Sequence, residues 1–144
     1  ADVDYHLIDA LAVRLKKLFS AERTLLYAPL AVGQHVDHQL VFQAALQVCS
    51  DGFQVWFYED YPYAENYQKL AQVLQAWAVP PMPVVYLLEE EDIEAKIAAI
   101  RLYSSQLPVL FGNEASVPSR IRKYALAVGG GQSYGERYWK DGVR

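Results

Sequence analysis

The stretch that decides the fold reads Thr24-Leu25-Leu26-Tyr27-Ala28-Pro29-Leu30-Ala31-Val32-Gly33-Gln34-His35-Val36-Asp37-His38. Its apolar beginning is typical of a buried strand, which we predict over residues 24–28. Gly33 indicates a turn, and the polar cluster after it leads into an apolar helical pattern that runs to Val48. The polar cluster therefore lies at the carboxyl end of a strand, the edge where open α/β sheets collect ligands and active sites.

Hydrophobic periodicity also predicts the neighbouring elements. We expect helices over residues 5–19, 37–49, 66–77, 92–106 and 119–128, and further strands over residues 54–58 and 84–88. The last stretch, residues 132–144, shows no clear periodicity. A strand, a helix and a second strand in succession predict a parallel pair joined by a right-handed crossover. No boundary interrupts the pattern, so we predict a single domain over residues 1–144, long enough to bury a core.

Composition limits the class of function. The formal net charge is −4 and no basic run follows the chain, so nothing favours nucleic acid as a partner. No segment is apolar for long enough to predict a membrane span. The single cysteine, Cys49, falls on the apolar face of a predicted helix, where an inert buried thiol is expected. One cysteine forms no internal disulfide and fits a reducing compartment, which predicts a cytoplasmic location.

Two histidines three residues apart suit several kinds of site. His35 and His38 are able to share a metal ion, or one binds the metal while the other moves a proton. The alternative is a capping and hydrogen-bonding cluster at a helix start, with no metal. Spacing alone leaves both readings open.

Four ordered motifs resemble one family. Residues 29–38 resemble the second metal motif of the LmbE-like or PIG-L family, zinc-dependent N-acetylglucosaminyl de-N-acetylases. Residues 58–64, Tyr-Glu-Asp-Tyr-Pro-Tyr-Ala, resemble that family's Tyr-Glu-Asp-x-Pro-Tyr-Ala stretch. Residues 96–106 resemble its Lys-x-x-Ala-Ile-x-x-Tyr-x-Ser-Gln helix, and residues 135–138 its closing Ala/Gly-Glu-x-Phe/Tyr. The resemblance covers nearly the whole chain.

The resemblance implies an α/β fold, a Rossmann-like three-layer sandwich with a mostly parallel sheet. It implies that His38 is a ligand of Zn²⁺, although His and carboxylate ligands accept other divalent ions as well. It places His35 near the scissile carbonyl as an electrostatic stabiliser or general acid. Asp37 would fix the tautomer of His35, and a role as helix N-cap is the alternative for Asp37.

Four further residues are candidates for substrate contact. Glu59 and Asp60 follow the second strand at the same sheet edge, so we expect them to contact substrate hydroxyls or to support the metal ligands. Gln106 and Glu136 belong to family-like motifs and are candidates for substrate contact or for packing. Turn and cap roles are the alternatives for Glu59 and Asp60.

The chain departs from the family in one respect. It contains no His-Pro-Asp-Asp segment, which in the family supplies a His and an Asp as metal ligands and a second Asp as general base. His6, the remaining histidine, is expected on a helix surface instead. The chain thus looks like the C-terminal portion of a family member that lacks the N-terminal strands.

These observations predict metal-dependent hydrolysis of the N-acetyl group of an N-acetylglucosamine-type sugar conjugate. The expected partners are that small-molecule conjugate and the N-terminal portion of the same protein, as a separate or cleaved chain. A homo-oligomer is compatible with the sequence. The alternative is a non-catalytic sugar-binding module that has lost the metal site.

Overall fold

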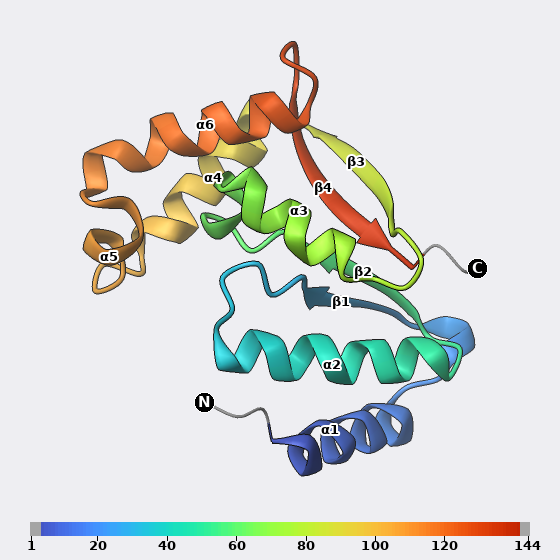
Figure 1. The fold of residues 1–144 in the computed structure, drawn as a ribbon. Coiled ribbons are helices and arrows are strands. Elements are labelled where there is room, and N and C mark those ends of the chain that lie inside the picture. Colours follow the sequence, from blue (N-terminus) through green and yellow to red (C-terminus); the bar gives the residue numbers. More distant parts are fainter. Residues whose placement is uncertain (1–3, 142–144) are drawn as a thin grey trace. The chain divides into compact units, whose positions relative to one another are not determined.

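The computed structural model describes residues 4–141, which form two compact units. The first unit holds the chain up to Pro83 together with the residues from Tyr138 onward, and the second holds Val84–Arg137. Four strands lie in the order β1-β2-β4-β3 (Figure 1). The first unit contains α1 (Tyr5–Leu18), β1 (Leu25–Pro29), α2 (Val36–Ser50), β2 (Gln54–Tyr58), α3 (Tyr67–Gln75) and the end of β4 (Tyr134–Lys140).

The sheet is mixed. β1 and β2 are parallel, in register from Leu25 opposite Gln54 to Pro29 opposite Tyr58, as the crossover predicts. On its other side β2 pairs antiparallel with β4, where Trp56 lies opposite Lys140. The expected α/β fold is confirmed, whereas a mostly parallel sheet is not. β4 forms in the stretch whose sequence shows no clear periodicity. Nearly all of its residues are half-buried, so successive side chains do not alternate between core and solvent.

The core of the first unit lies between the strand pair and α2. Ala28, Val55 and Phe57 pack there against Val48 and Cys49, and the cysteine is buried as predicted. Figure 1 shows α2 between the strands and α1. The inward residues of α1 are Ile8 and Ala12, whereas Leu7 and the C-cap residue Phe19 are exposed.

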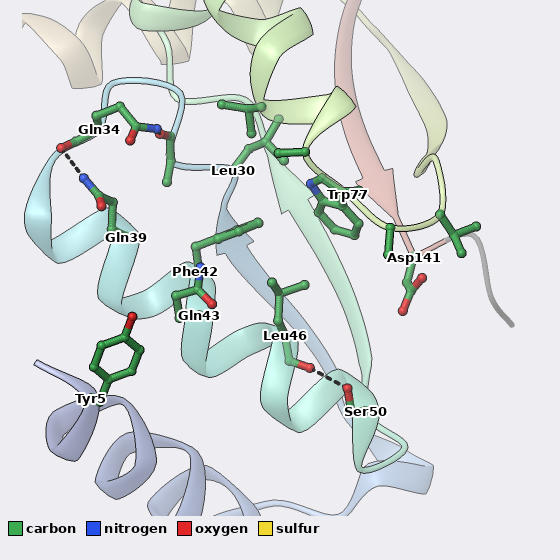
Figure 2. Close-up of a pocket in the computed structure, with 15 residues that line it drawn as sticks. Tyr5, Leu30, Gln34, Gln39, Phe42, Gln43, Leu46, Ser50, Trp77 and Asp141 are labelled. Atoms are coloured by element: carbon green, nitrogen blue, oxygen red, sulfur yellow. Dashed lines mark hydrogen bonds between the residues drawn. The ribbon is translucent and has the colours of Figure 1, made fainter. Parts of the chain in front are cut away.

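A pocket of about 600 Å³ opens in the first unit (Figure 2). Apolar side chains from α2 and from the segment after α3 line most of it, among them Phe42, Leu46 and Trp77. The indole nitrogen of Trp77 is buried and has no hydrogen-bond partner among the described residues. None of the residues predicted for the metal or substrate site lines this pocket.

The second unit contains most of β3 (Met82–Leu88), α4 (Glu90–Arg101), α5 (Leu107–Phe111) and α6 (Val117–Val128). In α4 the buried residues are Ile93 and Ile97, which are four positions apart and so lie on one face of the helix. The helix predicted to run to residue 106 ends at Arg101, and α5 follows after a short turn. Pro108 lies in the first turn of α5, where its missing N–H removes no helical hydrogen bond. Within residues 4–141, no helix is both long and apolar enough for a membrane crossing.

Candidate metal centre

The carboxyl ends of β1 and β2 meet at one edge, where the backbone N–H of Leu30 donates to the carbonyl of Tyr58 at 2.9 Å. The loop after β1 and the loop after β2 therefore lie side by side, because parallel strands end at the same edge of a sheet. His35 and His38 come from the first loop and the start of α2, and Asp60 comes from the second loop. The sequence predicted this shared edge.

The loop after β1 is held in an uncommon conformation. Ala31 and Gln34 have φ angles of 61° and 57°, a left-handed region that residues other than glycine rarely occupy. The Gln34 side chain donates to the carbonyl of Ala31 at 2.9 Å, and Gln39 donates to the carbonyl of Gln34 at 2.6 Å. Gly33 lies against the ring of Tyr63, so closely that a β-carbon there would meet ring atoms at 2.5–2.8 Å. The sequence predicts the turn at Gly33 but not the contact of Gly33 with Tyr63.

His35 is the N-cap of α2. Its Nδ1 accepts a hydrogen bond from the backbone N–H of Asp37 at 3.4 Å. The N-cap is thus His35, and Asp37 lies in the first turn, where a negative charge complements the helix dipole. The Asp37 carboxylate is 3.7 Å from His35 Nδ1, and both side chains are exposed. Because Nδ1 accepts the backbone donor, a neutral His35 carries its proton on Nε2.

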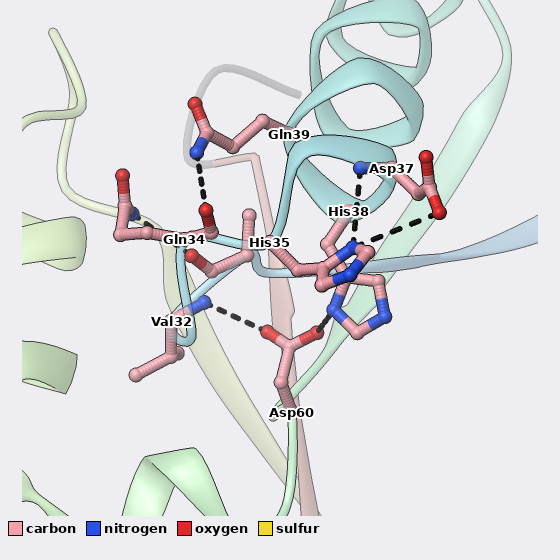
Figure 3. Close-up of polar contacts among 8 residues, drawn as sticks. Val32, Gln34, His35, Asp37, His38, Gln39 and Asp60 are labelled. Carbon is pink, nitrogen blue, oxygen red and sulfur yellow. Dashed lines mark hydrogen bonds and ion pairs between the residues drawn. The ribbon is translucent and has the colours of Figure 1, made fainter. Parts of the chain in front are cut away.

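His38 contacts Asp60 directly (Figure 3). Its Nδ1 lies 2.7 Å from Asp60 Oδ1, and the other ring nitrogen, Nε2, points away from the carboxylate. Both contacting atoms are buried, although the His38 side chain as a whole is 37% exposed. The ring of His35 lies beside that of His38, with 5.7 Å between centroids. The two histidines therefore present neighbouring edges on one accessible surface.

Asp60 is the buried acid of this site, only 3% exposed. Its Oδ2 accepts from the backbone N–H of Val32 at 2.8 Å, which ties the two loops together. Burial raises the pKa of Asp60, while the Val32 N–H and His38 oppose that rise. Because the pKa is raised, folding favours the protonated form of Asp60. This contribution to the free energy of unfolding is fully present below the ordinary pKa of 3.8, and it is lost as the pH rises through the pKa of the folded state. Burial, with a smaller effect from Asp60, also raises the pKa of Tyr58.

The other substrate candidates have partners of their own. Glu59 accepts a hydrogen bond from the Trp139 indole at 2.8 Å, within the first unit. In the second unit, Glu136 pairs with Lys96 at 2.5 Å, and Gln106 is an exposed residue at the start of α5. Their contact with substrate stays a prediction.

The described residues fit part of a metal site. His38 is a suitable ligand because a carboxylate holds one ring nitrogen and leaves the other accessible. No group of three His, Cys, Asp or Glu side chains within residues 4–141 is close enough to hold a metal ion. His6 is exposed on α1, as expected of a helix-surface residue.

Comparison with known proteins gives the site its context. No protein-family model matches the sequence. A 2′-N-acetylparomamine deacetylase from Niallia circulans is 32% identical over 109 residues, which are 76% of this chain and 34% of that protein. A teicoplanin deacetylase solved in a zinc-inhibited form aligns with 97% of this chain and 54% of its own length, at 25% identity and a TM-score of 0.75. The chain is thus homologous to part of these deacetylases.

A further solved structure supports the fold of this LmbE-like chain. The deacetylase of the A40926 pseudoaglycone matches 94% of the chain and 57% of its own length, at 21% identity and a TM-score of 0.70. The chain thus spans about a third of its paromamine-deacetylase relative and little more than half of these solved structures. The family resemblance read from the four motifs is confirmed.

Proposed function

We propose that this chain supplies part of a metal-dependent deacetylase that hydrolyses the N-acetyl group of an N-acetylglucosamine-type sugar conjugate. The observation that carries the proposal is His38, held by the buried Asp60 carboxylate with its second nitrogen accessible at the sheet edge. Similarity to deacetylases of 2′-N-acetylparomamine and of teicoplanin supports the choice of reaction. The amide of an acetylated aminosugar is the common chemical feature of such substrates.

We propose zinc as the metal, with His38 as one ligand. A zinc ion would supply an activated water and would polarise the acetyl carbonyl. The fit of the described residues is limited to one ligand and the carboxylate behind it, so the other ligands would come from outside residues 4–141. His and carboxylate ligands also accept other divalent ions, which makes metal identity part of the test.

His35 is the proposed electrostatic stabiliser or general acid of the reaction. Its neutral form carries a proton on Nε2, since Nδ1 accepts the backbone N–H of Asp37. From that nitrogen the neutral ring would donate a hydrogen bond to the acetyl oxygen as an electrostatic stabiliser. As a general acid toward the departing amine, the ring would first carry a second proton on Nδ1 and return to the neutral form after the transfer. Asp37 is the proposed group that orients the His35 ring, through its backbone N–H at Nδ1 and its carboxylate 3.7 Å from the same atom. Glu59, Gln106 and Glu136 remain the proposed contacts to the sugar.

The proposed partner is the N-terminal portion of the same protein. Within the described part of the chain β1 has a strand neighbour on one side only, so its other edge is unpaired. On the face of β1 turned away from the core, Leu25 and Tyr27 are 37% and 52% exposed, and Tyr27 stacks edge-on with Trp56 and Tyr138. An apolar, aromatic face beside an open edge is a surface that further strands or helices would cover. We propose that such strands complete a mostly parallel, three-layer sandwich in the cytoplasm.

Reconstitution tests the proposed function. The chain would be combined with the N-terminal portion, incubated with 2′-N-acetylparomamine, and assayed for released acetate. We expect acetate release that a chelator abolishes and that added zinc restores. Sugar binding that ignores the chelator, with no acetate released, would instead support the non-catalytic sugar-binding module.

A further inference from the structure

Asp60 and His38 depend on each other for hydrogen bonding. Their contacting atoms, Oδ1 and Nδ1, are buried and have no other partner among the described residues. Buried polar atoms are nearly always paired, because an unpaired one forfeits the hydrogen bonds that it makes with water. The 2.7 Å separation therefore calls for one proton between the two atoms.

The hydrogen-bond donors around Asp60 determine whether a carboxylate or an amide fits at this position. Oδ2 already accepts from the Val32 N–H at 2.8 Å, a backbone donor that cannot be reversed. A carboxylate accepts at both oxygens, so it serves Val32 and His38 together. An amide in its place accepts at one atom only and presents N–H groups at the other.

From this geometry we infer that Asp60 is a positioning residue, which holds the proton of His38 on Nδ1 and so keeps Nε2 free to bind a metal. The inference rests on the proposed function, because it assigns Asp60 to the same site as a support of the ligand. It replaces a direct contact between Asp60 and substrate, since both carboxylate oxygens are already engaged. It also explains why an acid follows β2 at this position: the same side chain binds the loop after β1 through Val32.

Nitrogen NMR of the imidazoles tests the inference in the metal-free protein. The chain has three histidines, so His6→Gln and His35→Gln variants assign the signals of His38. At a pH high enough that the imidazole signals no longer change with pH, we expect Nδ1 of His38 to carry the proton and Nε2 to give the signal of a bare nitrogen. In Asp60→Asn the oxygen remains with Val32 and the amide faces Nδ1, so the proton moves to Nε2. Asp37→Asn, the same change beside His35, should leave the His38 tautomer untouched.

Metal binding provides the second measurement. Zinc affinity of the reconstituted protein should fall about 10–100-fold in Asp60→Asn, the usual effect of losing a carboxylate behind a histidine ligand. A wild-type His38 protonated on Nε2, or an unchanged tautomer in Asp60→Asn, would overturn the inference even if the enzyme is active. If the reconstituted protein shows the expected tautomers but binds no metal and releases no acetate, the result would count against the proposed function instead. Asp60 would then be a structural residue.

Discussion

His38 is the residue on which the metal proposal depends. We predict that His38→Ala lowers the metal affinity and acetate release of the reconstituted protein by about 100-fold or more, because an alanine offers no ligand atom. The free energy of unfolding should fall by about 1–3 kcal/mol, since Asp60 Oδ1 loses its partner. Circular dichroism should show an unchanged fold, because Asp60 retains the Val32 N–H. His6→Ala, at an exposed position of α1, is the matched control, and full activity of His38→Ala would remove the central claim about the metal.

Gly33 is the residue that lets the histidine loop lie against Tyr63. In Gly33→Ala the added β-carbon would meet the Tyr63 ring at 2.5–2.8 Å, so the ring or the loop must move. We predict a loss of about 1–3 kcal/mol in the free energy of unfolding, measured by urea titration, as for other overpacked sites.

A double-mutant cycle separates this clash from other effects of alanine. Tyr63→Leu removes the atoms that the new β-carbon meets, so Gly33→Ala should cost much less in that background. Equal costs in both backgrounds would show that the Gly33–Tyr63 contact does not limit the loop.

Among the elements, α4 owes its start to a reciprocal cap. The Asp92 carboxylate accepts from the backbone N–H of Glu89 at 2.9 Å, and the Glu89 side chain accepts from the N–H of Asp92 in return. We predict that Asp92→Ala costs about 1 kcal/mol in the free energy of unfolding, the typical value of a lost cap. Glu91→Ala removes the same charge from the same turn without touching the cap, so its smaller effect is the comparison. Thermal melts of both variants measure the two losses of stability. Equal losses would show that the effect comes from the helix dipole alone.

At the scale of the whole molecule, the open edge and outer face of β1 predict association with the N-terminal portion. Leu25→Lys places a charge on that face, so we expect it to weaken the association at least about tenfold. Leu18→Lys introduces the same change at an exposed position of α1 and should leave the association intact.

Titration calorimetry with the N-terminal portion measures both variants. A monodisperse monomer of this chain that unfolds cooperatively without any complement would argue against the proposed partner.

Local pattern by itself determined most of the elements and the place of the site. The β2 boundaries, the core role of Ile93 and Ile97, and the shared edge of the histidines and Asp60 all follow from short-range periodicity and strand order. Such features are readable because an element buries one face at a fixed spacing, and parallel strands must end together.

Only the tertiary structure decided the rest. β4 was not recognised because nearly all of its residues are half-buried, so its sequence shows no alternation between core and solvent. The N-cap of α2 is His35 and not Asp37, because the loop places His35 Nδ1 within hydrogen-bonding distance of the Asp37 backbone N–H. The pairing of Asp60 with His38 and Val32 joins residues 22 and 28 positions apart. No local pattern encodes these two contacts of Asp60, because they exist only after two strands have paired and their loops share a buried environment.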